Sequence, residues 1–252
     1  MSRGWALVTG ATAGIGAEFS KQLAVRGYDV VLVARDVDRL ADTAERIRRF
    51  GVRTEVLPAD LSVRSDVERV EARLQETAEP VVYLVNNAGY GLREPFEQNR
   101  LELEQAHLDV LVTAPMRLSH AALAAMLPRR AGTILNVASV AAYTPRGTYG
   151  AAKSWVLSFT RWANLTYRGR GVTVTAVAPG FVSTEFHDRM AVTKDGIPRL
   201  LWLDPPYVVA RALRAADRGR AVTIPSLRYR LIVGLSRVLP SRIVAKGALR
   251  GR

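Results

Sequence analysis

Tyr149 and Lys153 are the residues of this sequence whose types and spacing best suit proton transfer. They stand four positions apart in Tyr-Gly-Ala-Ala-Lys, so on a helix both side chains lie on one face. A phenol with a pKa of about 10 is a poor acid–base group at neutral pH, but a neighbouring ammonium favours the phenolate and lowers that pKa. The pair is therefore a candidate general acid and base. The alternative is a solvated pair on a helix surface.

A glycine-rich turn that contains Gly10, Gly14 and Gly16 is the second candidate site. It follows an apolar run at residues 5–8, and from Ile15 onward apolar residues recur at every fourth position, as on a helix. A strand, a turn and a helix N-terminus in this order predict an anion site, because bare backbone N–H groups and the helix dipole favour a pyrophosphate. The spacing Gly-x-x-x-Gly-x-Gly differs from the commonest dinucleotide fingerprint, and a plain glycine-rich turn is the alternative.

The elements that would position these residues alternate between two kinds. Apolar runs typical of buried strands lie at about residues 5–8, 29–34, 52–57, 81–85, 133–138, 172–177 and 221–224. The segments between them have helical periodicity; the longest spans about residues 101–126, where Pro115 predicts a kink, and Ser62 is the expected N-cap of an earlier helix. The alternation predicts an α/β fold with a doubly wound parallel sheet, in which ligands bind beyond the carboxyl ends of the strands.

Several polar or glycine-containing motifs follow those strands, and as a set they resemble the motifs of the short-chain dehydrogenase/reductase family. The match runs from Arg3 to about Ile224 and rests on the glycine turn, Asn86-Asn87-Ala88-Gly89, Ser139, Tyr-x-x-x-Lys and Pro179-Gly180. The resemblance implies a single Rossmann-like domain over residues 1–225. It also implies an NAD(P)(H)-dependent oxidoreductase that interconverts a carbonyl and an alcohol by hydride transfer.

The resemblance implies a role for each site residue. Ser139 would hold the substrate oxygen, Tyr149 would be the general acid in reduction and the general base in oxidation, and Lys153 would bind the nicotinamide ribose and lower the tyrosine pKa. The other residues implied at the cofactor are Gly10, Thr12, Ala13, Gly14, Ile15 and Gly16 in the turn, Asp60 and Leu61 at the adenine, Asn86, Ala88 and Gly89 beside the cofactor, and Pro179, Gly180, Val182 and Thr184 around the nicotinamide.

Two features depart from the family pattern. Many members carry an asparagine in the middle of the long helix, where it supports a proton relay, and counting from Asn86 places Leu111 there. Leucine can neither donate nor accept a hydrogen bond, and Thr113 is the nearest polar alternative. The loop between Ser139 and Tyr149 is also shorter than usual, so the assignment of the serine rests on its place at a strand end.

The end of the second strand predicts the cofactor. An acidic residue there would bind the adenosine ribose of NAD, but in this chain Ala34 is followed by Arg35. A guanidinium suits the 2′-phosphate of NADP, and Arg39 one turn later could assist. We therefore expect NADP (NADPH). The alternative is a solvated Arg35 with Asp36 at the ribose.

The composition argues against several other chemistries. The 252 residues include no cysteine, which excludes disulfides, thiolate catalysis and cysteine-ligated zinc, and the three histidines are scattered, so we expect no metal site. No apolar run approaches the ~20 residues that a membrane-spanning helix requires, and the early first strand leaves no room for a signal peptide. We therefore expect a soluble, cytoplasmic protein.

The net charge of +13 is concentrated near the C-terminus, where nine basic residues and no acidic residue follow Asp217. From Ser226 onward Leu227, Leu231, Leu235 and Val238 recur at helical spacing, with Arg230 and Arg237 on the opposite side. This pattern predicts a basic, amphipathic helical extension over residues 226–252. The extension either lies on an anionic membrane, peripherally on its inner surface, or packs on the protein or a subunit partner. We expect no nucleic-acid binding, because the charge is not spread over the domain.

An apolar segment at residues 181–203 bears on the substrate. It contains Phe181, Phe186, Met190, Ile197, Leu200, Leu201 and Trp202. In the family that this chain resembles the corresponding segment closes over the substrate, so we expect a small, lipophilic ketone, aldehyde, acyl derivative or alcohol, and a homodimer or homotetramer. Two other function classes stay open: an NADP-binding sensor or scaffold that has lost catalysis, and a factor that acts on membranes or nucleic acid through its tail.

Overall fold

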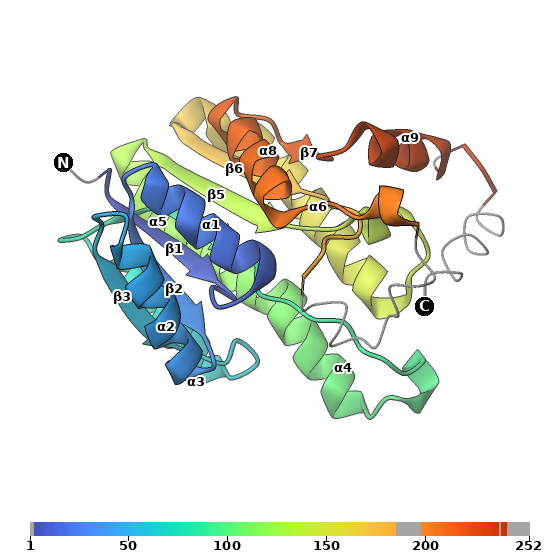
Figure 1. The fold of residues 1–252 in the computed structure, drawn as a ribbon, viewed down its shortest axis with the longest axis horizontal. Helices are drawn as coiled ribbons and strands as arrows, with labels where there is room; N and C mark the ends of the chain where they lie inside the picture. The colour runs from blue at the N-terminus through green and yellow to red at the C-terminus, as the bar shows by residue number, and fades with distance from the viewer. Residues whose placement is uncertain (1–2, 185–197, 237, 241–252) are drawn as a thin grey trace.

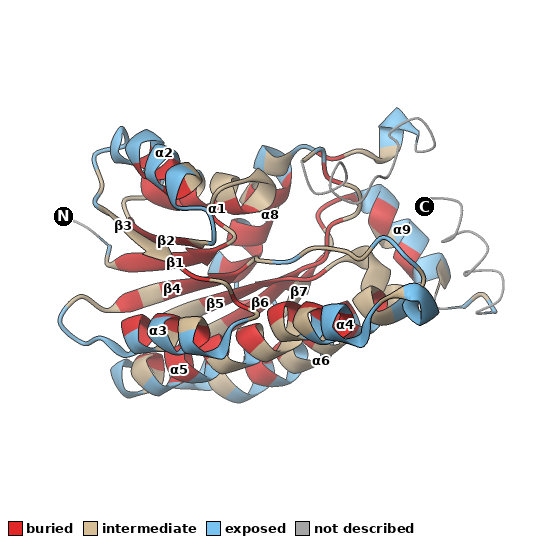
Figure 2. Cartoon of the chain, turned by 90° about the horizontal axis from the view of Figure 1, so that it is seen from below, coloured by how far each residue is buried: buried red, intermediate tan, exposed pale blue. Residues whose placement is uncertain are grey.

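The computed structural model describes residues 3–184, 198–236 and 238–240, and in this part of the chain a parallel sheet lies between two layers of helices (Figures 1 and 2). Its seven strands pair in the order β3-β2-β1-β4-β5-β6-β7. Their bounds are β1 Trp5–Thr9, β2 Asp29–Ala34, β3 Thr54–Pro58, β4 Val81–Asn86, β5 Gly132–Val137, β6 Val172–Val177 and β7 Val222–Thr223. The strand order reverses between β1 and β4, so a crevice for a ligand is expected at the carboxyl ends of these two strands.

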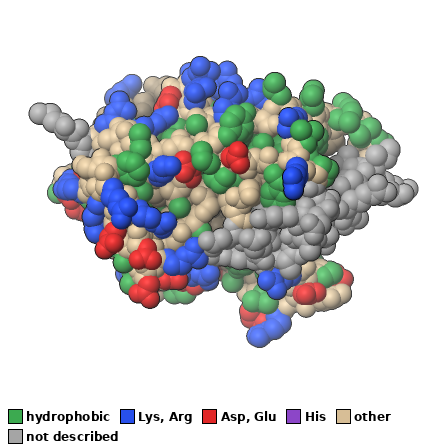
Figure 3. All heavy atoms as spheres, in the orientation of Figure 1, with side chains coloured by type: hydrophobic (Ala, Val, Ile, Leu, Met, Phe, Trp, Pro, Cys, Tyr) green, Lys and Arg blue, Asp and Glu red, His purple; other side chains and the backbone are tan. Residues whose placement is uncertain are grey.

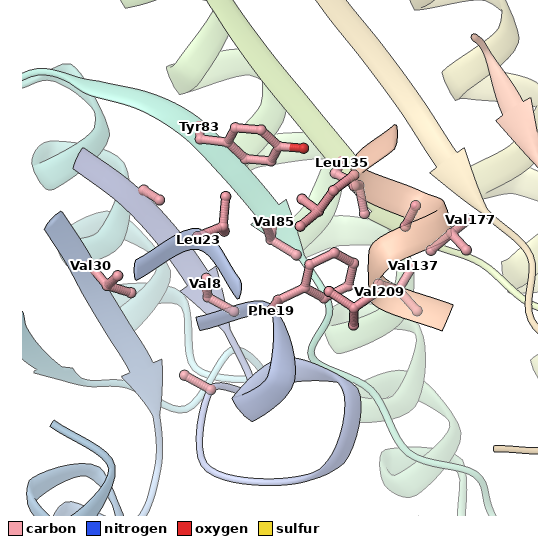
Figure 4. Close-up of a cluster of buried hydrophobic side chains, with 14 of the residues drawn as sticks. Val8, Phe19, Leu23, Val30, Tyr83, Val85, Leu135, Val137, Val177 and Val209 are labelled. Atoms are coloured by element: carbon pink, nitrogen blue, oxygen red, sulfur yellow. The ribbon is translucent and has the colours of Figure 1, made fainter. Parts of the chain in front are cut away.

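Helices cover both faces of the sheet, as Figure 2 shows. On one face lie α1 Gly14–Val25, α2 Val37–Arg48 and α8 Pro205–Asp217, and on the other α3 Arg64–Gln75, α4 Leu101–Leu108, α5 Ala114–Arg129 and α6 Gly147–Tyr167. Each face has its own apolar core. Figure 4 shows the first of these, where Phe19 and Leu23 of α1 meet Val85 of β4 and Val209 of α8. The predicted doubly wound α/β fold is confirmed.

Every residue of β1 is buried, and five of the six residues of β2 are buried. This is why these strands read in the sequence as continuous apolar runs rather than as alternating patterns. β3 is only half-buried because it lies at the edge of the sheet. Burial of both sheet faces therefore explains which strands the sequence marks most clearly.

The long helix and one helix start differ from expectation. The helix is continuous from Leu101 to Arg129, but it turns π-helical at η2 Asp109–Thr113, immediately before Pro115, which stands in the first turn of α5. Ser62 is not an N-cap: α3 begins at Arg64, and the Ser62 hydroxyl instead donates to Asp60 Oδ1 at 2.7 Å. The short side chain thus closes a turn at the end of β3.

By length and composition, one segment within the described ranges could cross a bilayer, namely Leu101–Arg129, with a mean hydropathy of 1.4 in an 18-residue window. Half of that window is buried, and α5 packs against α3 and the sheet. An apolar helix that covers a face of a sheet can be as long and as apolar as a helix that spans a membrane. Its place in the fold is therefore that of a core helix.

The C-terminal segment folds back onto the protein as α9 Leu227–Ser236. Its buried residues are Tyr229 and Val233, and Tyr229 joins the same apolar core as α1 and α8. The apolar stripe of the predicted extension is exposed, at Leu227, Leu231, Leu235 and Val238. The alternative in which this stripe packs on the body of the protein is therefore wrong, because the helix packs through a different face. Arg237 and residues 241–252 lie outside the described residues.

Candidate active site

A cavity of about 1050 Å³ opens at the carboxyl ends of the strands, where the strand order reverses between β1 and β4. Most of the predicted site residues line it. They are Gly10, Thr12, Ala13, Gly14, Ile15, Arg35, Arg39, Asp60, Leu61, Ala88, Gly89, Ser139, Tyr149, Lys153, Pro179, Gly180, Val182 and Thr184. Gly16 and Asn86 do not line it. The fold thus brings together residues from nearly the whole length of the chain.

The glycine turn offers backbone rather than side chains to this cavity. Gly10 and Gly14 have φ values of +65° and +51°, a region that only glycine adopts readily. Gly16 acts by packing, because a Cβ there would stand 2.1 Å from the Gly10 carbonyl oxygen. The helix N-cap is Ala13, which has no side-chain acceptor, so the first N–H groups of α1 stay available to a ligand. This cradle fits the pyrophosphate of a dinucleotide.

Asn86 serves the core and not the cavity, which corrects its assignment beside the cofactor. Its side-chain amide donates to Ser119 Oγ at 3.1 Å and to Asn136 Oδ1 at 2.9 Å, and Asn136 in turn donates to Thr160 Oγ1 at 2.9 Å. This buried network ties β4 and β5 to α5 and α6. Asn86 therefore stabilises the layer under the site.

Asn87, which the sequence reasoning passed over, is the residue of this pair that supports the site. Its side-chain amide donates to the carbonyl oxygen of Thr9 at 2.8 Å and to that of Gly10 at 3.3 Å. It also lines the cavity. The asparagine thus fixes the start of the glycine turn to the end of β4. The repeated Asn-Asn pair was the available signal, but sequence alone did not say which residue faces inward.

Ser139, Tyr149 and Lys153 meet on one wall of the cavity. Ser139 follows β5, and its Oγ accepts from the backbone N–H of Ala141 at 3.1 Å. Lys153 is buried on α6, where its Nζ donates to the carbonyl oxygen of Val137 at 2.8 Å and lies 5.7 Å from the centroid of the Tyr149 ring. The predicted one-face placement of the tyrosine and lysine is therefore present.

Burial controls the protonation of both groups. Tyr149 keeps partial exposure to the cavity, yet burial raises its pKa to about 12, against the hydrogen bond with Ser139 and the nearby Arg146 guanidinium, which both lower it. Burial lowers the pKa of Lys153 to about 8. The net shift of the Tyr149 pKa is therefore upward, opposite to the effect expected of the Lys153 ammonium, because desolvation outweighs the contributions of Ser139 and Arg146. At neutral pH the phenol keeps its proton.

His107 is a further residue of the site that the sequence reasoning missed. It is fully buried, and its ring stacks on Tyr149 with centroids 6.2 Å apart and planes at 25°. Its Nε2 lies 3.0 Å from the carbonyl oxygen of Tyr90, whereas its Nδ1 has no hydrogen-bond partner among the described residues. Burial lowers its pKa, so the ring is neutral. The one available signal was its place a helical turn before Leu111.

Leu111 packs against Gly89, a residue of the cavity lining. Its Cδ2 would stand 2.8 Å from a Cβ placed at Gly89, and the same Cβ would lie 3.7 Å from Lys153 Nζ. Leu111 is itself buried, so an apolar methyl group fills this place close to the lysine. A larger residue at position 89 would have no room.

Arg35 and Arg39 line the far end of the cavity beyond β2. Arg35 Nη1 lies 3.7 Å from Asp60 Oδ2, and Arg39 Nη2 donates to the carbonyl oxygen of Thr12 at 3.4 Å. Asp36, the alternative ribose ligand, accepts from the Arg39 backbone N–H at 3.0 Å and thereby caps α2. Two guanidinium groups therefore stand at this end of the cavity, where Asp60 is the carboxylate beside Arg35 and Asp36 caps α2.

The other end of the cavity is apolar. Its walls include Phe181, Leu201, Tyr229, Ile232, Leu235 and Leu239. The Phe181 ring also packs against Trp202, with centroids 5.7 Å apart. Of the predicted apolar segment, Leu200 is exposed, and Phe186, Met190 and Ile197 lie outside the described residues. Among the described residues, no group of three His, Asp or Glu side chains is placed to hold a metal.

Comparison with known proteins gives one family. The family described as short chain dehydrogenase matches residues 4–195. A very-long-chain 3-oxoacyl-CoA reductase of Anas platyrhynchos is 34% identical over 190 residues, a match that covers 72% of this chain and 60% of that relative. A short-chain dehydrogenase of Sphingobium yanoikuyae, solved in complex with NADPH, is 35% identical with a TM-score of 0.84, covering 93% and 94% of the two chains. A bulky-bulky ketone specific alcohol dehydrogenase of Comamonas testosteroni is 32% identical with a TM-score of 0.81, covering 95% and 96%.

Proposed function

Because this chain belongs to the short-chain dehydrogenase/reductase family and is an oxidoreductase with a nicotinamide cofactor, we propose that it reduces bulky, lipophilic ketones with NADPH. The observation that carries the proposal is the shared cavity, which joins the glycine turn at one end to Ser139, Tyr149 and Lys153 and then to an apolar wall. Catalytic loss, as in a sensor or scaffold, is not favoured, since all three catalytic side chains stand in place.

When bound, the nicotinamide supplies the hydride that reduces the carbonyl carbon. Tyr149 donates its phenolic proton to the carbonyl oxygen, and Ser139 donates a hydrogen bond to the same oxygen. Lys153, held by the Val137 carbonyl, stabilises the phenolate that remains and binds the ribose hydroxyls. The raised pKa of Tyr149 keeps its phenol protonated at neutral pH, which is the form that a reduction requires.

NADPH is the proposed cofactor because two guanidinium groups line the end of the cavity where the adenosine would lie. Arg35 and Arg39 would bind the 2′-phosphate, while Asp36 is engaged in capping α2. Asp60 and Leu61 line the cavity beside them, where the adenine would lie. A relative in complex with NADPH supports this choice.

His107 is proposed as a positioning residue for Tyr149. A neutral ring stacked on the phenol restricts its orientation, and the hydrogen bond to the Tyr90 carbonyl fixes the imidazole. The resulting fixed ring would hold the phenol in the orientation that proton transfer needs.

We propose a homo-oligomer assembled through α6. This helix carries a row of aromatic rings, Trp155, Phe159, Trp162 and Tyr167, whose neighbouring centroids are 5.0–5.8 Å apart. Trp162 and Leu165 remain 53% and 83% exposed, which is costly on a lone subunit. A second copy of the same helix would cover them, and light scattering of Trp162→Glu against the unaltered protein measures the change in mass.

The substrate class is tested with a panel of ketones and aldehydes graded by size. Consumption of NADPH followed by absorbance should increase with apolar bulk, because residues such as Phe181, Leu201 and Ile232 give that end of the cavity an apolar wall. Turnover confined to small, polar carbonyl compounds would contradict the proposed substrate. An absence of turnover across the whole panel would contradict the enzyme assignment.

A further inference from the structure

We propose that one edge of the molecule is a docking surface for an anionic phospholipid membrane. The docking surface has two parts, an arginine cluster and an apolar stripe. The cluster consists of Arg211, Arg214, Arg218, Arg220 and Arg230, and the stripe consists of Leu227, Leu231, Ile232, Leu235 and Val238. The arginines would bind headgroup phosphates, and the stripe would enter the boundary between headgroups and acyl chains.

The arginine cluster is built from three segments. Arg211, Arg214 and Arg218 come from α8 and its C-terminal cap, Arg220 from the turn before β7, and Arg230 from α9. All five line one small surface hollow together with Ala215 and Thr223. Convergence of five like charges is unfavourable unless an anion neutralises them.

No carboxylate of the described residues pairs with any member of the cluster. The nearest acidic residue in sequence, Asp217, is engaged elsewhere, because both of its oxygens accept from Arg26 Nη1 at 3.1 Å. The Arg230 Nε–H donates to the carbonyl oxygen of Ile224. This bond fixes the guanidinium in place but leaves its charge unneutralised. The cluster thus presents donors that suit phosphate oxygens.

The apolar stripe lies directly beside the cluster. Leu227, Leu231 and Leu235 follow one another at intervals of four residues along α9, and they are 71%, 75% and 57% exposed. Their regular spacing puts them on one face, while Tyr229 and Val233 hold the opposite face to the protein. Figure 3 shows basic side chains along the upper edge of the molecule over α8 and hydrophobic ones beyond them over α9.

A membrane fits this pairing better than other macromolecules do. In a symmetric contact between two copies, the same arginines would approach one another, and like charges would oppose association. A nucleic-acid backbone would satisfy the arginines but offers no apolar phase to five exposed aliphatic side chains. An anionic bilayer presents phosphates at its surface and hydrocarbon immediately below them.

The stripe is also continuous with the active-site cavity. Ile232 and Leu235 are exposed at 44% and 57% and line the cavity as well. Docking would therefore place the apolar end of the cavity at the bilayer. This consequence rests on the proposed function, because a lipophilic ketone could then enter from the lipid phase without crossing water.

The test is flotation of the full chain with vesicles of phosphatidylcholine alone and of phosphatidylcholine with phosphatidylglycerol. We expect binding only to the anionic vesicles, and weaker binding at high salt, because the screening length falls from about 10 Å at 0.1 M to about 3 Å at 1 M salt. Each arginine near the surface contributes about fivefold (~1 kcal/mol). Arg214→Glu with Arg218→Glu should therefore lower vesicle partitioning by at least about 25-fold.

A matched control makes the same charge change at the opposite edge of the sheet, Arg48→Glu with Arg49→Glu at the end of α2. It should keep nearly full binding. Leu227→Gln with Leu231→Gln, two residues outside the cavity, should lose vesicle binding while turnover of a water-soluble ketone stays unchanged. Because flotation needs no catalysis, it succeeds or fails independently of the proposed function.

Four results would overturn the proposal. Equal loss in the cluster variant and the α2 control would show an effect of net charge alone. Binding of inorganic phosphate by the protein, with no flotation on anionic vesicles at the same ionic strength, would assign the cluster to a free anion. Retained flotation of the leucine variant, or binding of duplex DNA with no vesicle binding, would assign the surface to another partner.

Discussion

The ring of Tyr229 lies so close to Gly180 that a Cβ at position 180 would stand 1.9 Å from the tyrosine Cζ. The two residues are far apart in sequence, yet the Tyr229 hydroxyl accepts from the Phe181 N–H at 3.0 Å and donates to the Leu201 carbonyl oxygen at 2.8 Å. One side chain of α9 thus fixes two separate segments that line the cavity. The C-terminal helix is consequently part of the site.

Tyr229→Phe should loosen this junction. It leaves the Phe181 N–H without its acceptor, so we expect a loss of about 1–3 kcal/mol in the free energy of unfolding, together with a higher KM for bulky ketones. Denaturant unfolding and steady-state kinetics measure the two effects. Tyr207→Phe is the matched control, because it also removes a hydroxyl bonded to a carbonyl oxygen (Pro225, 2.8 Å) but does not line the cavity. An equal rise in KM in both variants would contradict the role of Tyr229.

Tyr149→Phe should abolish proton donation and leave the cofactor site intact. Loss of a general acid lowers turnover by about a hundredfold to ten-thousandfold, whereas the dissociation constant for NADPH should hardly change. Tyr143→Phe serves as the control, because Tyr143 ends the short helix η3 Val140–Tyr143 and lies outside the cavity lining. Near-normal turnover in Tyr149→Phe would remove Tyr149 from its catalytic role.

Substitutions of Asn86 and Asn87 should have different effects on the stability of the fold and on NADPH binding. Asn86→Ala removes two buried donors and is expected to cost about 1–3 kcal/mol of unfolding free energy with unchanged NADPH affinity. Asn87→Ala releases the glycine turn from β4 and should weaken NADPH binding more than it lowers stability. Thermal unfolding and NADPH titration of the two variants provide the comparison, and the reverse pattern would restore Asn86 to the cofactor site.

The sequence predicted the sheet, many residues of the cavity lining and the candidate catalytic residues, because each was encoded locally. Parallel strands buried on both faces read as apolar runs, and Tyr149 and Lys153 are joined by a single helical turn. Side chains at the carboxyl ends of such strands meet by topology alone. Short-range spacing and fold class were therefore sufficient for this part.

What the sequence could not predict depends on contacts between distant segments. The role of Tyr229 requires knowing that α9 returns to Gly180, and the stacking of His107 on Tyr149 requires knowing how α4 lies against α6. The same holds for the net pKa shift of Tyr149, which depends on how much solvent the folded chain removes. The leucine periodicity of α9 was real, but periodicity does not say which face a helix buries.

Arg35→Ala should weaken binding of NADPH far more than binding of NADH. Loss of a charge-assisted contact to the 2′-phosphate costs about 1.5–3 kcal/mol, or roughly tenfold to a hundredfold. We expect the lower end, because the Arg35 side chain is 70% exposed and partly screened by water. Arg48→Ala, an exposed arginine of α2 outside the cavity, is the control. Equal losses for both cofactors would show that Arg35 does not recognise the phosphate.

Affinity for NADPH and turnover in the reductive direction should both fall as the pH rises through about 8. The reason is that burial lowers the pKa of Lys153 to about 8, so its ammonium loses the proton there, while Tyr149, with a pKa of about 12, still carries its own.

The stability of the folded chain should change with pH in the opposite direction. Between pH 8 and 10.5 the unfolded chain binds a proton at Lys153 that the folded chain does not. The free energy of unfolding should therefore gain up to about 1.4 kcal/mol per pH unit from this residue. Lys153→Met removes that gain, so denaturant unfolding of both proteins at several pH values in this window isolates it. Parallel pH dependence of stability in the two proteins would show that Lys153 does not titrate near pH 8.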